Sequence, residues 1–175
     1  CDTPLDEEIV GENVYLNIIN KARRYVYICT PYLIIDNEMM TALCLAAKNG
    51  VDVRIMTPGT PDKKLVFLLT QSYYRQLLEN GVKIYEYQPG FLHAKTFVCD
   101  DEIAVVGTIN LDYRSLYLHF EDGVWIYGND VIWSMKEDFV QTLEDCHTVP
   151  LEFCKNRKIP VRIMQNVLRA FAPML

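Results

Sequence analysis

The stretch from residue 91 to residue 121 holds the side chains whose types and spacing could do chemistry. His93 and Lys95 stand two residues apart, so on a strand their side chains point to the same face. The apolar residues around them indicate a semi-buried site, where an unpaired charge is costly. An anionic ligand is the simplest compensation for an imidazole and an ammonium presented together, and the imidazole can then act as acid, base or nucleophile.

Further polar groups follow downstream. Gly107 allows close approach of the backbone, while Thr108 and Asn110 offer a hydroxyl and an amide just beyond an expected strand end, where ligands bind in α/β sheets. These donors suit a phosphate. Glu121 could accept the second ring proton of His93 and fix its tautomer. For an isolated His-x-Lys pair, an ordinary histidine beside a surface lysine would be the better interpretation.

Helical and extended patterns alternate along the chain and must position these residues. Helices are expected over 12–24, 38–49 and 62–80, each followed by a strand, over 25–30, 51–56 and 82–87. Three helix-then-strand units in succession predict an α/β fold with a mixed, largely parallel sheet and helices on both faces. Later expected elements are strands at 93–99 and 103–106 forming a tight hairpin, a polar loop over 107–118, a strand over 119–127, and helices over 130–146 and 161–172.

Taken together, these residues form a pattern with fixed spacings. His93-x-Lys95 followed by Asp100, then Gly107-Thr108-x-Asn110 and Glu121, resembles the HxKxxxxD motif of the phospholipase D superfamily at every position. The wider sequence resembles the carboxy-terminal half of bacterial cardiolipin synthases over nearly the whole chain. The stretches that carry this resemblance are Gly11–Tyr15, Thr30–Ile34, Asp52–Pro58, Gly107–Ser115 and Phe171–Leu175.

The resemblance implies a phospholipase D-like fold and a phosphatidyl transfer through a phosphohistidine, in which two phosphatidylglycerol molecules give cardiolipin and glycerol. It implies no cofactor and no metal, and the six cysteines and three histidines show no metal-ligand spacing. The residues it assigns to catalysis are His93, Lys95, Asn110 and Glu121. Those it assigns to the substrate phosphate are Lys95, Thr108 and Asn110, and those that shape the motif are Asp100 and Gly107.

In that family the catalytic centre combines two motifs, and this chain holds one. His119 and His147 have no lysine two residues on, and His119 is interpreted as a residue bordering the site. The second motif is expected from the amino-terminal half of a longer parent, or from a second copy of the chain across a two-fold axis. The parent is favoured because the chain begins at Cys1 rather than Met, and His93 then becomes the general acid that later acts as base.

Charge divides the chain into two parts. Residues 1–150 carry 12 basic and 22 acidic side chains, a net of −10, whereas residues 151–175 carry five and one, a net of +4. We expect a catalytic half over 1–150 and a basic tail over 151–175, whose amphipathic helix packs on the same domain or lies on an anionic membrane. No apolar run approaches the roughly 20 residues that cross a bilayer. The chain is therefore expected to be soluble, cytoplasmic or peripheral, and its parent to be at the cell membrane with anionic phospholipid as partner.

Two other functions compete with this interpretation. A single-motif homodimeric phosphodiesterase or nuclease of the same superfamily would use the same chemistry on a different diester. The net charge of −6 and the lack of a basic groove outside the tail argue against nucleic acid. An inactive scaffold that binds anionic head groups would need a damaged motif, and this motif is intact.

Overall fold

Hydrogen-bond ladders join seven strands into one sheet in the order β8-β6-β5-β1-β3-β4-β9, and strands β2 and β7 form a separate pair. The computed structural model describes residues 3–5 and 7–174, so Cys1 and Leu175 of the predictions lie outside it. The strands are β1 (Tyr25–Cys29), β2 (Leu33–Ile34), β3 (Asp52–Pro58), β4 (Lys83–Tyr87), β5 (Thr96–Cys99), β6 (Ile103–Gly107), β7 (Leu111–Asp112), β8 (Gly123–Tyr127) and β9 (Cys146–Thr148). The helices are α1 (Val10–Lys21), α2 (Asn37–Lys48), α3 (Lys64–Glu79), α4 (Tyr113–Tyr117), α5 (Val131–Thr142), α6 (Leu151–Lys155) and α7 (Ile159–Ala170), with 3-10 turns η1 (Leu143–Asp145) and η2 (Ala172–Met174).

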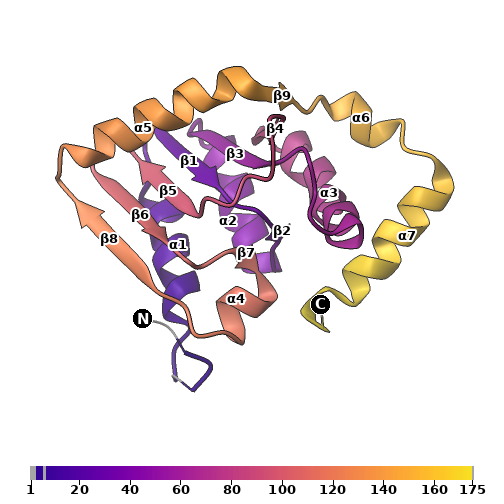
Figure 1. Ribbon diagram of the computed structural model, residues 1–175, viewed down its shortest axis with the longest axis horizontal. Helices are drawn as coiled ribbons and strands as arrows, with labels where there is room; N and C mark the ends of the chain where they lie inside the picture. Colours follow the sequence, from indigo (N-terminus) through magenta and orange to yellow (C-terminus); the bar gives the residue numbers. More distant parts are fainter. Residues whose placement is uncertain (1–2, 6, 175) are drawn as a thin grey trace.

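The mixed α/β sheet with helices on both faces is confirmed (Figure 1). Its parallel part is smaller than predicted, because within the described seven-stranded sheet two pairings, β1–β3 and β3–β4, are parallel and four are antiparallel. Helices α2 and α3 supply the crossovers that parallel neighbours need. Strands β5 and β6 instead follow each other through a tight turn at Asp100 and Asp101, both in the left-handed region with φ of 54° and 63°.

Each face of the sheet has its own apolar core. Helices α1, α2 and α3 cover one face, where Tyr15 stacks on Phe97 with ring centroids 4.0 Å apart. Helix α5 covers the other, where Phe139 stacks on Tyr27 at 4.9 Å. Because both faces are covered, the central strand β1 is buried along its whole length, which explains why its sequence is apolar and aromatic throughout.

Several boundaries differ from the prediction. Strand β5 begins at Thr96 rather than at residue 93, because its partner β1 ends at Cys29, two residues before Pro31. Strand β8 begins at Gly123 rather than at residue 119, since its ladder with β6 ends at Gly107. The expected helix over 130–146 stops at Thr142, the next three residues form the 3-10 turn η1, and Cys146 begins the short edge strand β9.

The tail over 151–175 forms α6 and α7, and both lie against α3 (Figure 1). None of the described helices combines the length and the apolar character that crossing a bilayer requires.

Candidate active site

The predicted site residues gather at the edge where the parallel strands end. Cys29, the last residue of β1, pairs with Thr96, so Lys95 lies immediately beyond the carboxyl end of the central strand. Gly107 at the end of β6 donates its N–H to the carbonyl of Lys95 at 3.3 Å. The site therefore occupies the position at which ligands bind in open α/β sheets.

His93 and Lys95 meet, although not on a strand as predicted. Residues 91–95 form an irregular segment before β5, in which the His93 side chain is exposed and Lys95 is only 8% exposed. The Lys95 Nζ lies 2.9 Å from His93 Nε2 and donates a second hydrogen bond to the His93 carbonyl, also at 2.9 Å. The Phe91 ring packs beside the imidazole at 5.6 Å between centroids. A buried ammonium thus holds an imidazole that solvent can reach.

Two carboxylates set the electrostatics of this lysine. Burial lowers the pKa of Lys95, and the negative charges of Glu121 and Asp112 oppose that shift. Burial also raises the pKa of Asp112. The lysine is therefore held near two buried acids without a direct ion pair to either among the described residues, which leaves its ammonium available to an anionic ligand.

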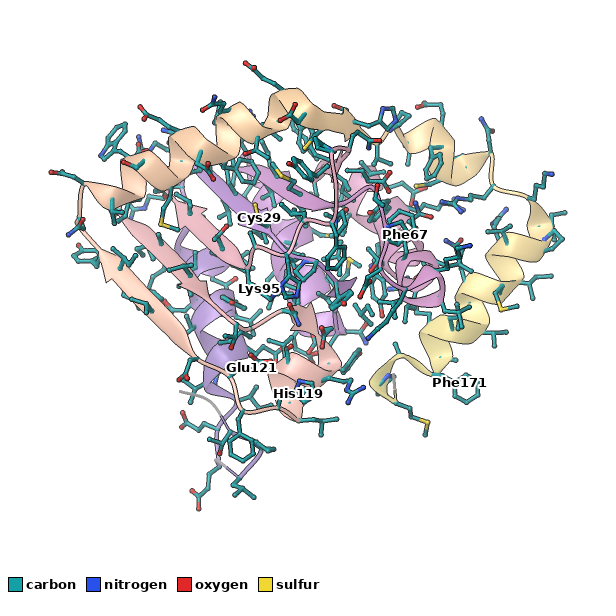
Figure 2. All side chains as sticks on the ribbon, in the orientation of Figure 1. Cys29, Phe67, Lys95, His119, Glu121 and Phe171 are labelled. Atoms are coloured by element: carbon teal, nitrogen blue, oxygen red, sulfur yellow. The ribbon has the colours of Figure 1, made fainter. Side chains whose placement is uncertain are left out.

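Glu121 contacts Thr108 and His119 rather than His93. The Thr108 hydroxyl donates to Glu121 Oε2 and accepts from the Asp122 N–H at 3.0 Å. The Nδ1 of His119 lies 3.7 Å from Glu121 Oε1. No hydrogen bond between His93 and Glu121 is present among the described residues, so the expected orienting contact is not made. Figure 2 shows Lys95, Glu121 and His119 converging on the same region below the sheet.

Gly107 is required by close backbone approach. A Cβ at this position would lie 2.2 Å from the carbonyl oxygen of Asp122 and 2.7 Å from the Cα of Gly123, its partner across the β6–β8 ladder. Any side chain here would push the two strands apart, and Thr108 and Glu121 lie just beyond them. The glycine thus fixes the distance between two groups of the site.

A cavity of about 280 Å³ opens beside Asn110 and His119, and most of its polar lining comes from residues 110–119. The Asn110 amide donates to Ser115 Oγ at 2.9 Å, while its buried Oδ1 has no hydrogen-bond partner. Ser115 in turn donates its N–H to Asp112, which caps α4. Sequence reasoning assigned Ser115 no role, although an aspartate three residues before a serine is typical of a helix N-terminus. The other polar or aromatic residues lining the cavity are Tyr32, Lys63, Tyr113, Arg114 and His119.

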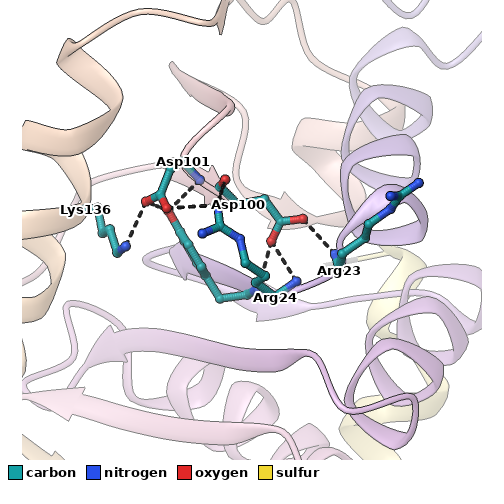
Figure 3. A network of polar contacts seen from close by, with 6 residues as sticks. Arg23, Arg24, Asp100, Asp101 and Lys136 are labelled. Carbon is teal, nitrogen blue, oxygen red and sulfur yellow. Dashed lines mark hydrogen bonds and ion pairs between the residues drawn. The ribbon is translucent and has the colours of Figure 1, made fainter.

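Asp100 lies at the opposite end of β5 from Lys95 and makes structural contacts (Figure 3). Its carboxylate accepts from the backbone N–H groups of Arg23, Arg24 and Tyr25 at 2.7, 2.9 and 2.8 Å. The Arg24 guanidinium donates to the Asp100 carbonyl and pairs with Asp101 at 2.9 Å. The motif aspartate therefore ties the β5–β6 turn to the junction between α1 and β1.

The third histidine is far along the sheet from this site. His147 belongs to β9, an edge strand on the other side of β4, where it pairs with Glu86. The described chain therefore offers His93 and the exposed His119 at the site, and only His93 has a lysine beside it.

Comparisons with known proteins agree with this geometry. A family model described as "Cardiolipin synthase, PLD-like domain" matches residues 15–143. An uncharacterized protein of Streptococcus mutans is 53% identical over 99% of the chain, which covers 38% of that protein. A cardiolipin synthase of Clostridium perfringens is 46% identical over 94% of the chain and 34% of its own length, and one of a Geobacillus species is 40% identical over 95% and 33%. The chain thus spans about a third of the length of the curated relatives that it matches.

Solved structures share the fold at low sequence identity. The phospholipase D family member Nuc of Salmonella typhimurium superposes with a TM-score of 0.68 at 18% identity, covering 79% of this chain and 90% of Nuc. The phosphatidylserine synthase of Haemophilus influenzae gives a TM-score of 0.72 at 18% identity, covering 94% of this chain and 42% of that protein. With the family model spanning most of the sequence, the chain belongs to the family of phospholipase D-like domains of cardiolipin synthases.

Proposed function

We propose that this chain provides one of the two catalytic motifs of a cardiolipin synthase, which transfers a phosphatidyl group from one phosphatidylglycerol to another and releases glycerol. The observation that carries the proposal is the contact between a buried ammonium and an exposed imidazole, Lys95 Nζ to His93 Nε2 at 2.9 Å. Family membership supplies the reaction class, and the geometry supports the assignment of roles to residues of this chain.

Lys95 recognises the substrate phosphate. An ammonium can only donate, so its contact with His93 requires an unprotonated Nε2 in the free protein. A non-bridging phosphate oxygen competes for the same ammonium and attracts it more strongly, because a charge-assisted bond to an anion is stronger than one to a neutral acceptor. Phosphate binding thus draws Lys95 to the substrate and frees Nε2 of the exposed His93, which can then take up from solvent the proton that it gives to the leaving glycerol oxygen.

Thr108, Asn110 and Glu121 complete the phosphate site. The Thr108 hydroxyl and the Asn110 amide lie in the loop beyond Gly107, and Asn110 also lines the cavity. The Asn110 amide supplies a neutral donor for an oxygen that gains charge in the transition state, and the Thr108 hydroxyl does so when its proton turns from Glu121 to the substrate. Glu121 holds Thr108 in place and balances the positive charge of Lys95.

The reaction needs a second imidazole. In the first step one histidine forms a bond to phosphorus as the bond to the glycerol oxygen breaks, and the other histidine gives its proton to that oxygen. In the second step the hydroxyl of another phosphatidylglycerol loses its proton to that second histidine, attacks phosphorus and displaces the first. His93 takes the acid–base role, and the nucleophile comes from a motif outside this chain.

The test uses the protein expressed from its complete reading frame in membranes, with cardiolipin formation and glycerol release as readouts. His93→Ala is expected to lower the rate at least about a thousandfold, because it removes a reacting group. The matched control is His147→Ala, a histidine on the far edge strand β9, which should leave the rate unchanged. Equal rates for His93→Ala and the unaltered protein would contradict the site assignment, and loss of activity in excess chelator would contradict a metal-free reaction.

The same variants also test the homodimeric alternative. If the 175-residue chain alone hydrolysed a phosphodiester as a dimer and His93→Ala abolished that activity, the second motif would come from another copy. We expect the isolated chain to be inactive, because it supplies one lysine-paired histidine.

A further inference from the structure

The terminal helix α7 presents its apolar side outward. Large apolar side chains occupy that side, with exposed fractions between 48% and 82%. They are Ile159, Ile163, Met164, Val167, Phe171 and, in the following turn, Met174, and we call them the outer face of α7. Figure 2 shows the Phe171 ring pointing away from the body of the protein. A surface helix of a globular protein normally turns its apolar side toward the core, so this arrangement is inverted.

Polar contacts hold the helix in this orientation. Gln165 is only 7% exposed and donates to the Leu68 carbonyl of α3 at 3.1 Å. The Arg169 guanidinium lies 4.4 Å from the centre of the Tyr73 ring and donates to Gln76 at 3.2 Å. The inner side of α7 combines these polar contacts with Leu168, which packs against the core, and it is fixed to α3 at successive turns. The outer face is consequently a stable surface of the fold.

Positive charge gathers near the amino-terminal end of α7 and in the groove between α7 and α3. Lys155, Lys158 and Arg162 are exposed, and no carboxylate pairs with them in the part of the chain that the structure describes. A groove of about 380 Å³ between α3 and α7 adds Arg75, Arg157 and Arg169 to Arg162, against the single carboxylate of Glu79. The tail carries +4 while the remainder carries −10, so the segment that contains the outer face of α7 is also the basic part of the chain.

We propose that the outer face of α7 inserts into the interface of an anionic phospholipid bilayer, with the surrounding lysines and arginines on the lipid head groups. Exposed apolar side chains flanked by cations are what a helix lying in a membrane interface requires. A second copy of the chain is a poorer occupant, because a two-fold contact through this helix would bring two basic tails together. Lys155, Lys158 and Arg162 are exposed near the amino-terminal end of α7, and they supply the cations for the head-group phosphates.

The experiment measures co-sedimentation of the 175-residue chain with vesicles of phosphatidylcholine alone or of phosphatidylcholine mixed with phosphatidylserine, an anionic lipid that gives a membrane surface its negative potential. Phosphatidylserine is chosen because it is not the proposed substrate, and a His93→Ala background removes any contribution of turnover. We expect binding to the anionic vesicles to be at least about tenfold tighter than to phosphatidylcholine.

Variants then locate the binding surface. Ile163→Glu combined with Phe171→Glu should weaken vesicle binding at least about tenfold, and Lys158→Gln combined with Arg162→Gln should do so by roughly tenfold or more. The matched control is Leu45→Glu, which places the same charge on an exposed apolar position of α2 and should change binding less than about twofold. Circular dichroism and thermal unfolding of each variant confirm that the fold is kept.

Three results would overturn the proposal. The first is an absence of vesicle binding, and the second is binding that the α7 variants leave unchanged, which would assign it to another surface. The third is a lipid-free dimer in sedimentation equilibrium that Ile163→Glu with Phe171→Glu dissociates, which would make a second copy the occupant. None of these outcomes depends on the proposed transfer reaction, so its failure would be recognised separately.

Discussion

Replacing Asp100 by asparagine tests whether the aspartate of the motif acts in folding rather than in chemistry. The residue lies five positions after Lys95 at the far end of β5, about 16 Å away at the usual rise of an extended strand. Its two carboxylate oxygens accept three backbone N–H groups, from Arg23, Arg24 and Tyr25. Asparagine tolerates the left-handed backbone at this position, so the substitution changes the acceptors and leaves the turn unstrained.

The size of the effect follows from the geometry. Asparagine keeps one acceptor oxygen, which can retain the bonds from Arg24 and Tyr25, but turns an amide toward the N–H of Arg23 and removes the negative charge from all three bonds. A hydrogen bond to a charged group contributes about 1.5–3 kcal/mol, and the exposure of both arginines reduces this value. We expect Asp100→Asn to lower the free energy of unfolding by about 2 kcal/mol, which for a chain of this size corresponds to roughly 4–8 °C in Tm.

Urea unfolding followed by circular dichroism measures this loss. The control is Asp130→Asn, which removes the same charge from an exposed residue before α5 whose side chain caps no backbone group, and it should be neutral within about 0.5 kcal/mol. In the complete protein, Asp100→Asn should keep its transfer rate at temperatures well below its Tm. A variant of unchanged stability that has lost transfer activity would refute the structural assignment.

Three further outcomes are expected. Gly107→Ala should destabilise the fold by more than about 3 kcal/mol in urea unfolding, whereas Gly123→Ala should cost under about 1 kcal/mol, because its Cβ would meet only ordinary contacts at 3.6 and 3.7 Å. Burial and the adjacent Asp36 carboxyl raise the pKa of Glu12 from 4.5 to about 7, so the native state binds a proton that the unfolded state releases, and stability contributed by this group falls as pH rises from 4.5 to 7. Glu12→Gln should remove this pH dependence, so that by pH 8 the variant has lost less free energy of unfolding than the unaltered protein, by on the order of 1–3 kcal/mol. Curves of stability against pH that run parallel for the two proteins would contradict this expectation. Because burial lowers the pKa of Lys95, Lys95→Met should leave Tm unchanged or higher while abolishing transfer, and a Tm loss above roughly 4 °C would show that the ammonium stabilises the fold.

The pattern of helix and strand was predictable from the sequence wherever local and tertiary signals agreed. Strand β1 is aromatic or β-branched from Tyr25 to Ile28 and ends near Pro31, and α2 ends before Gly50, so both were located within a residue or two. The extent of parallel pairing was not predictable in the same way. It depends on the direction of the strand that pairs with β1 on the side away from β3. That strand is β5, and its sequence does not indicate whether it runs parallel or antiparallel to β1.

The site was likewise predictable from the sequence only in part. The spacing of His93 and Lys95 brings both side chains together even though the segment is irregular, because alternation persists in any extended backbone. The partner of Glu121 was not predictable, since it is decided by how closely β6 and β8 approach at Gly107 and Gly123. The role of Ser115 was not predicted, because its contact with Asn110 depends on the short helix α4, which begins between the two residues.

These observations explain why the spacing within the motif is strict. Lys95 and Asp100 bracket β5, so the four residues of that strand set the distance between the phosphate site and the turn that Asp100 fixes to the start of β1. One residue more or fewer would reverse the alternation along the strand, and it would turn either the lysine away from Glu121 or the aspartate away from the backbone it binds. We therefore propose that Asp100 acts only through the register of β5, and we expect its loss to appear in the free energy of unfolding before it appears in the transfer rate.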